Sequence, residues 1–125
     1  MIKRVYAPKA PKPAGPYSQG IEASGFLFVS AQLGVDPATG VMADGVDAQA
    51  SRALENVLEV LRAGGSGWSS VVKVTLYLVD MSTFARVNEI YSSKLGDAAP
   101  ARSTVGVSTL PRGGLVAADA VAVVS

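Results

Sequence analysis

Hydrophobic and polar residues alternate along the first part of the chain in a pattern typical of short strands. Residues 2–6 and, more weakly, 17–23 alternate, and residues 26–30 (Phe-Leu-Phe-Val-Ser) form a clear strand pattern that we expect to end at residues 30–32. Prolines at positions 8, 11, 13 and 16 lie between the first two segments. Proline lacks the N–H that a helix interior needs, so this connection is predicted to be extended and rich in turns.

From Asp47 to Ala63 the spacing of the apolar residues changes to that of a helix. The positions that follow this spacing are Ala50, Ala53, Leu54, Val57, Leu58 and Leu61. Asp47 suits the first turn, and residues 64–67 (Gly-Gly-Ser-Gly) are expected to end the helix. We expect Trp68 to pack over that end.

The second half of the chain combines three strand patterns with one more helix. Residues 71–79 form the strongest strand pattern, and residues 100–107 and 115–124 are predicted strands separated by a turn. On the strand at 71–79 we expect one face to carry Val72, Val74, Leu76 and Leu78 and the other face to carry Lys73, Thr75 and Tyr77. Cap-type residues at 80–83 precede a helix that runs to about Leu95.

The predicted order of elements is β-β-β-α-β-α-β-β, which indicates an α+β fold with two helices on one side of a mixed sheet. No repeat or linker divides the sequence, so we expect residues 1–125 to form a single domain. The last strand is apolar on both of its faces, with Val121 and Val123 on one and Val116 and Ala118 on the other. Helices on one side of the sheet would leave its second face exposed to water, so we expect that face to contact other copies of the chain.

Composition excludes several kinds of chemistry. The chain has no cysteine and no histidine, which removes disulfides, thiol nucleophiles, the usual zinc sites and imidazole acid–base catalysis. Hydrophobic residues make up 49% and charged residues only 17%, and the net charge is +1 with the basic residues scattered. We therefore expect no metal, no nucleic-acid partner and no membrane partner. The N-terminus does not resemble a signal peptide, and the expected location is cytoplasmic.

Residues 100–107 (Pro-Ala-Arg-Ser-Thr-Val-Gly-Val) carry the strongest chemical signal. Arg102 and Thr104 share one face of the predicted strand, whereas Ser103 lies on the other. A guanidinium in such a place needs an anionic partner, because burying an unpaired charge is costly. The residues alone leave two alternatives open: an ion pair within the protein, for which Asp119 is a candidate, or the carboxylate of a ligand.

Several short motifs, taken together and in this order, resemble one family. They are Gly15-Pro16-Tyr17-Ser18-Gln19, Ser30-Ala31-Gln32, Asn88-x-x-Tyr91, Pro100-Ala101-Arg102-Ser103-Thr104-Val105 and Leu110-Pro111. The set is similar to the Rid family of reactive intermediate (enamine/imine) deaminases, also called YjgF-like or endoribonuclease L-PSP proteins. The resemblance implies a chorismate-mutase-like (bacillus type) α+β subunit. It also implies a homotrimer whose sheets form a central barrel, with a ligand cleft at each subunit interface.

The resemblance also implies an activity and a set of site residues. The activity is hydrolysis of 2-imino and 2-amino-2-enoic acids, such as 2-iminobutanoate and 2-iminopropanoate, to 2-keto acids and ammonia, without a cofactor. The residue matching the family's carboxylate anchor is Arg102. The other positions that match residues around the family's substrate are Ser103, Thr104, Tyr17, Ser30, Ala31 and Asn88. For Tyr17, Ser30 and Asn88 the alternatives are packing, a local backbone bond and a solvent-facing position, respectively.

One departure from the family weakens the expectation of turnover. The family's water-activating glutamate falls at Ala117, and Asp119 lies two residues farther on the same strand face, as a possible secondary acid. A second hypothesis is therefore a trimeric small-carboxylate-binding or regulatory protein with little turnover. The ribonuclease role attached to some relatives ranks last, because phosphodiester cleavage needs acid–base groups and phosphate contacts that the composition does not suggest.

Overall fold

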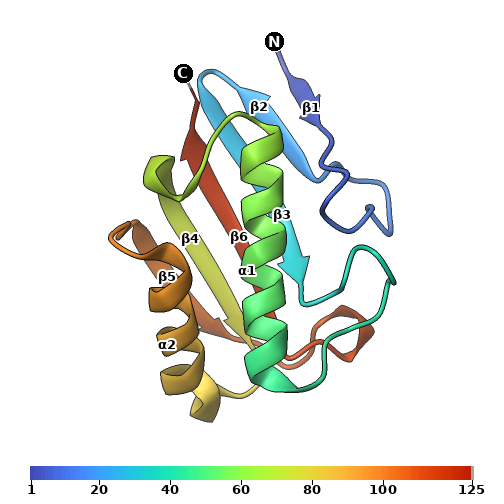
Figure 1. Ribbon diagram of the computed structural model, residues 1–125, viewed down its shortest axis with the longest axis vertical. Coiled ribbons are helices and arrows are strands. Elements are labelled where there is room, and N and C mark those ends of the chain that lie inside the picture. The colour runs from blue at the N-terminus through green and yellow to red at the C-terminus, as the bar shows by residue number, and fades with distance from the viewer. Residues whose placement is uncertain (125) are drawn as a thin grey trace.

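The computed structural model describes residues 1–124 and consists of one sheet covered on one side by two helices (Figure 1). The strands are β1 (Lys3–Val5), β2 (Gly20–Ala23), β3 (Phe26–Leu33), β4 (Val71–Leu78), β5 (Ala101–Gly106) and β6 (Val116–Val123). The helices are α1 (Gly45–Ala63) and α2 (Phe84–Leu95), with short 3₁₀ turns η1 (Trp68–Ser70), η2 (Met81–Thr83) and η3 (Pro111–Gly113).

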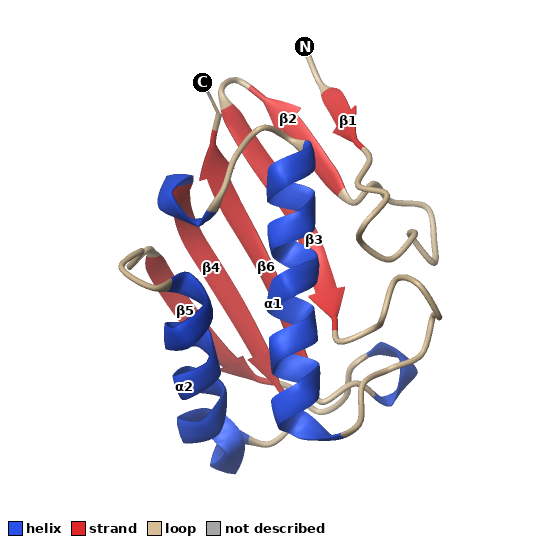
Figure 2. Ribbon diagram, viewed as in Figure 1, coloured by secondary structure: helices blue, strands red, loops and turns tan. Residues whose placement is uncertain are grey.

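The six strands lie in the order β1-β2-β3-β6-β4-β5, so the C-terminal strand β6 runs through the middle of the sheet. All neighbouring strands are antiparallel except β4 and β5, which are parallel. Parallel neighbours need a crossover connection, and α2 supplies it. The predicted α+β fold, a mixed sheet with two helices on one face, is confirmed (Figure 2).

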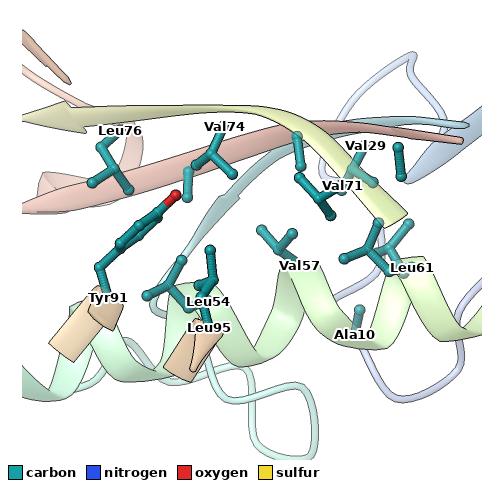
Figure 3. Packing of buried hydrophobic residues seen from close by; sticks show 14 of the residues in the cluster. Ala10, Val29, Leu54, Val57, Leu61, Val71, Val74, Leu76, Tyr91 and Leu95 are labelled. Atoms are coloured by element: carbon teal, nitrogen blue, oxygen red, sulfur yellow. The ribbon is translucent and has the colours of Figure 1, made fainter. Parts of the chain in front are cut away.

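The hydrophobic core lies between the helices and one face of the sheet (Figure 3). From the sheet this face contributes Leu27, Val29, Val74, Leu76, Leu78, Val116, Ala118, Ala120 and Ala122. Against it α1 packs Leu54, Val57 and Leu61, the apolar stripe that the helical spacing predicted. Val87, Tyr91 and Leu95 of α2 complete the layer, so β5 and α2 meet at one side of the core.

The opposite face of the sheet, called the open face below, has no helix over it. Phe26, Phe28 and Val123 lie there and are 41%, 46% and 41% exposed. Phe26 pairs with Val123 and Phe28 with Val121, so these side chains form a continuous apolar strip across β3 and β6. Both faces of β6 are thus apolar, as the sequence predicted.

Two strands near the N-terminus differ from their predicted extents. The predicted strand at 17–23 contains only β2, because residues before Gly20 form a turn in which the Tyr17 N–H donates to the Gly15 carbonyl. Strand β3 does not end at residues 30–32; it continues to Leu33 through a bulge between Val29 and Gln32. The bulge keeps the strand paired with β6 but shifts the register by one residue, because residues 30 and 31 together lie opposite residue 119.

The predicted inward face of β4 was wrong at its first position. A register shift between Val71 and Lys73 places Val71 in the core and leaves Val72 42% exposed. Beyond the shift, Val74, Leu76 and Leu78 face inward as expected.

The other element boundaries moved by one or two residues. Helix α1 begins at Gly45, two residues before the predicted start, and β6 is one residue shorter at each end than predicted. The cap residue Asp80 acts one turn earlier than expected: its carboxylate accepts from the Ser82 N–H and hydroxyl within η2, which lowers the pKa of Asp80. Trp68 packs against the core from η1.

Within residues 1–124 the structure has no helix long and apolar enough to cross a membrane.

Candidate functional site

Arg102 lies near the start of β5, on the face of the sheet that α2 covers. Arg102 pairs in register with Val74 and Thr104 with Leu76, and both partners point into the core. Neighbouring residues of a parallel pair share a face, so Arg102 and Thr104 point toward α2. Strand β5 is an edge strand, which leaves Arg102 half-buried rather than enclosed.

One face of α2 holds the guanidinium in place. Phe84, Asn88 and Tyr91 are spaced by four and three residues and therefore lie on one side of the helix. Asn88 Oδ1 accepts a 2.7 Å hydrogen bond from Arg102 Nη1, and the guanidinium carbon lies 4.8 Å from the Tyr91 ring centroid and 5.5 Å from that of Phe84. These contacts fix the plane of the guanidinium. Phe84, Asn88, Tyr91, Arg102 and Thr104 are called the Arg102 cluster below.

The geometry bears on the alternatives left open for Arg102 and Asn88. Among the described residues, no carboxylate lies within salt-bridge distance of Arg102. An ion pair with Asp119 is ruled out, because Asp119 lies on the open face. Asn88 does not simply face solvent, since it accepts the Arg102 bond. The remaining N–H groups of Arg102 are therefore available to an anion that is not part of the described chain.

Two buried polar atoms in the Arg102 cluster lack partners. Tyr91 Oη and Thr104 Oγ1 are buried and make no hydrogen bond to any residue that the structure describes. Burial raises the pKa of the Tyr91 phenol, and the positive charge of Arg102 opposes this shift. Figure 3 shows the Tyr91 ring extending from α2 toward Val74 and Leu76 of β4. Buried polar groups in proteins are usually satisfied, so these two unpartnered atoms beside a cation need an explanation.

The outer edge of β5 exposes backbone donors beside Arg102. Val107 donates its N–H to the Leu78 carbonyl of β4, and backbone groups alternate in direction along a strand. The N–H groups of Arg102 and Thr104 therefore face away from β4, toward the free edge. The N–H of Ser103 faces β4, and its side chain is exposed on the open face. Of the two matching positions that follow Arg102, only Thr104 presents its backbone N–H to the free edge of the sheet.

Tyr17, Ser30 and Ala31 lie together at a second place, where the bulge of β3 meets the N-terminal loop. Ser30 Oγ donates to the Ser18 carbonyl at 2.6 Å, and the Ser30 N–H donates to the Gln19 carbonyl at 2.9 Å. Ser30 therefore bonds to the backbone of the N-terminal loop, which was the alternative to a role at the substrate. Tyr17 and Ala31 are exposed and line one hollow, called the Tyr17 hollow below.

The wall of this hollow is secured by a buried amide. Gln19 is 2% exposed. Its Oε1 accepts from the Ala7 N–H at 2.7 Å, and its Nε2 donates to the Ala7 and Pro11 carbonyls at 3.0 and 2.8 Å. The amide thus fastens the proline-rich segment to the sheet, which gives the hollow a fixed side.

Within one chain the Arg102 cluster and the Tyr17 hollow are far apart. They lie on β5 and β3, which β6 and β4 separate. Three strand spacings amount to about 14 Å, more than a small carboxylate can bridge. The predicted site residues are therefore brought together in two groups rather than one.

Asp119 is engaged with a tyrosine on the open face. Tyr77 donates a 2.8 Å hydrogen bond from its hydroxyl to Asp119 Oδ2. This bond, together with burial and the nearby negative charge, raises the pKa of the Tyr77 phenol. Ala117 lies between Leu33 and Tyr77 in the register and is 2% exposed. The position that matches the family's glutamate is thus an apolar one, and its acidic neighbour is already bonded.

The arrangement around Arg102 suits recognition of a small anion. Within residues 1–124 no group of three or more acidic side chains gathers at a place that could hold a metal ion. The Arg102 cluster instead offers an oriented guanidinium, a free strand edge and apolar walls.

Phe84 and Tyr91, whose rings lie against the Arg102 guanidinium, were not among the predicted site residues. Tyr91 was named only as part of the Asn88-x-x-Tyr91 motif. The available signal was their spacing around Asn88, which places aromatic, amide and aromatic side chains on one helix face.

The fold defines a small α+β protein of the class described as endoribonuclease L-PSP, whose family model matches residues 7–124. A RutC family protein of Pyrococcus horikoshii is 44% identical over 123 residues, which cover 98% of each chain. A 2-iminobutanoate/2-iminopropanoate deaminase of Mus musculus is 41% identical over 122 residues, covering 97% of this chain and 90% of the relative. The crystal structure of E. coli TdcF with bound serine has a TM-score of 0.95 at 34% identity, covering 98% and 99% of the two chains. The chain belongs to the Rid family.

Proposed function

We propose that this protein hydrolyses reactive 2-imino and 2-amino-2-enoic acids, such as 2-iminobutanoate and 2-iminopropanoate, to 2-keto acids and ammonia. The observation that carries the proposal is the oriented, unpaired guanidinium of Arg102, held by Asn88 and two aromatic rings. Relatives about 40% identical carry the name of this deaminase activity. The bound serine of TdcF is consistent with a small amino-acid-like ligand in this family.

The chemistry of Arg102 suits the carboxylate of such a substrate. A planar guanidinium can bind a carboxylate through two parallel hydrogen bonds, which lysine cannot do. Each charge-assisted bond contributes about 1.5–3 kcal/mol. The outward N–H of Thr104 is a further donor at the same edge.

The site is proposed to form between copies of the chain in a homotrimer. The Arg102 cluster of one copy would then face the Tyr17 hollow of the next, which accounts for two groups of predicted residues about 14 Å apart in one subunit. The apolar open face supports such an assembly, because contiguous exposed hydrophobic surface marks sites of association.

Positioning is proposed to supply most of the catalysis. Water adds to the imine carbon, and the resulting tetrahedral adduct loses ammonia to leave the 2-keto acid. A carboxylate that accepts a proton from the attacking water contributes typically about 10²–10⁴-fold in rate, and Ala117 cannot do this. Imine hydrolysis can proceed on positioning alone, so we expect slow turnover.

Ala117 also supports a second candidate function. With an apolar side chain at this position and Asp119 bonded to Tyr77, the protein could bind 2-keto or 2-imino carboxylates without appreciable turnover. It would then act as a trimeric small-carboxylate-binding or regulatory protein.

The deciding experiment measures ammonia and 2-ketobutyrate released from enzymatically generated 2-iminobutanoate, with and without the protein. Acceleration that Arg102→Ala abolishes is the expected result. Arg62→Ala is the matched control, because Arg62 is an exposed arginine of α1 paired with Glu59. Binding of 2-ketobutyrate without acceleration would favour the binding protein, and neither binding nor acceleration would contradict both functions.

A further inference from the structure

The Tyr17 hollow carries two positive charges that no acidic lining residue balances. Lys12 and Arg112 are its charged lining residues, and no carboxylate lines it. In contrast, the hollow between α1 and residues 36–43 is lined by Arg52 and Lys94 together with Asp36 and Glu55. Because the whole chain has a net charge of only +1, two unbalanced cations in one concave place are a local feature rather than a reflection of a basic protein.

Arg112 is held at this place in an unfavourable backbone conformation. It has φ 60° and ψ 23°, in the left-handed region that residues with a side chain rarely adopt. Glycine would occupy the position without strain, and the next residue is Gly113. Strain of this kind persists where the surroundings impose it and is concentrated at functional sites.

The guanidinium of Arg112 is tethered but not neutralised. Nη2 donates to the Gly40 carbonyl at 2.8 Å, a neutral acceptor that fixes the side chain and leaves its charge uncompensated. Among the described residues no carboxylate lies within salt-bridge distance of Arg112 or Lys12.

From these observations we propose that Lys12 and Arg112 form a subsite for a second anionic group, so that the protein prefers ligands with two carboxylates. The inference rests on the proposed function, because it takes Arg102 of an adjacent copy as the anchor for the first carboxylate. Tyr17 and Ala31 line the same hollow as Lys12 and Arg112, so a ligand bound beside them would lie in the hollow that holds the two cations. The substrate class is then the 2-imino derivatives of amino dicarboxylic acids. An uncharged side chain would leave both cations without a partner.

The experiment compares two five-carbon product analogues that differ in their distal end. Calorimetric titration measures binding of 2-oxoglutarate, which ends in a carboxylate, and of 2-oxopentanoate, which ends in a methyl group. We expect the wild type to bind 2-oxoglutarate at least about tenfold more tightly, as one charge-assisted contact would give. Arg112→Gln should remove this preference and leave the affinity for 2-oxopentanoate unchanged. Arg62→Gln is the control and should keep the preference for 2-oxoglutarate.

Further variants separate failure of the subsite from failure of the proposed function. Arg112→Gly relieves the backbone strain and should also lose the preference for 2-oxoglutarate. It therefore tests the subsite even if Arg112→Gln fails to fold. Arg102→Ala should abolish binding of both acids. Equal binding of the two acids by the wild type would overturn the subsite while leaving the Arg102 site intact. Binding of 2-oxoglutarate that survives Arg102→Ala would also overturn it, because the cations would then act without the anchor. No binding of either acid would overturn the subsite together with the proposed function.

Discussion

At Arg102 a single helix face supplies what a charged residue on an edge strand needs. Asn88 accepts one hydrogen bond, and the rings of Phe84 and Tyr91 lie against the guanidinium. None of these contacts is an ion pair, so the positive charge is oriented without being neutralised. The proposed binding of a carboxylate needs such a guanidinium, whereas a carboxylate of the protein would already satisfy a structural arginine.

The first residue-scale prediction concerns Ala117. Replacing Ala117 by glutamate restores a carboxylate at the position that matches the family's water-activating residue. We expect the rate of 2-iminobutanoate hydrolysis to rise, by up to about 10²–10⁴-fold. Asp119→Asn is the companion variant and should change stability more than rate, because Asp119 accepts the Tyr77 bond. A correctly folded Ala117→Glu protein with an unchanged rate would show that positioning alone sets the turnover.

The second residue-scale prediction concerns the pH dependence of stability at Tyr77. Because folding raises the phenol pKa above its ordinary value of 10.0, the folded state favours the protonated hydroxyl. This stabilisation is fully present below pH 10.0 and is lost as the pH rises through the folded-state pKa. Tyr77→Phe should therefore lower the free energy of unfolding by about 1 kcal/mol at neutral pH. The difference in the free energy of unfolding between wild type and Tyr77→Phe should decrease as the pH rises through the folded-state pKa of Tyr77.

Denaturant unfolding from neutral pH to above pH 10.0 measures the stability difference between wild type and Tyr77→Phe. Tyr6→Phe is the control at an exposed tyrosine. A wild-type advantage that grows above pH 10.0 would contradict the assigned hydrogen bond.

At the scale of elements, β3 and α1 approach each other so closely that only glycine fits between them. A Cβ on Gly34, one residue past β3, would lie 2.6 Å from the Gln49 Cα and 2.7 Å from its carbonyl oxygen. Both atoms belong to the backbone of α1 and cannot swing aside. This contact holds the end of β3, and with it the bulge at Ser30 and Ala31, at a fixed place relative to the helix.

Gly34→Ala is therefore expected to destabilise the protein by about 1–3 kcal/mol or more, as overpacking does. Gly67→Ala is the matched control, because its Cβ would meet nothing within 4 Å and its φ of −171° is extended. Thermal or denaturant unfolding of both variants checks the prediction. Equal stability of the two would show that β3 and α1 can move apart without cost.

At the scale of the whole molecule, one face of the sheet is apolar and uncovered. Helices cover one side of the sheet, whereas Phe26, Phe28 and Val123 are 41–46% exposed on the other. Burial of apolar area stabilises by about 25 cal/mol per Å², which favours association of such faces. The expected homotrimer would cover this face and join the two groups of site residues.

Sedimentation equilibrium should therefore give three times the chain mass of 12.8 kDa. Phe28→Glu should shift the protein toward monomers and, because the proposed site lies between copies, should reduce carboxylate binding as well. Ile2→Glu adds the same charge at an exposed position outside the Phe26–Phe28–Val123 strip and should leave both unchanged. A stable wild-type monomer at micromolar concentration would contradict the assembly.

The sequence by itself determined the number, order and kind of the elements, because hydrophobic periodicity reflects which side of each element is buried. It also pointed to Arg102, since a strand with an isolated guanidinium needs an anion, and its motifs were sufficient to indicate the family. The bulges at Ser30–Ala31 and at Val72 were not predictable, because they depend on pairing with β6, which is distant in the sequence. Only the tertiary structure decided that Arg102 and Asp119 lie on opposite faces of the sheet, and that Asn88, Phe84 and Tyr91 surround the guanidinium. It alone showed that Tyr17 and Ala31 share a hollow with Arg112. The reason is that the order of strands in the sheet brings together segments that are distant in the sequence.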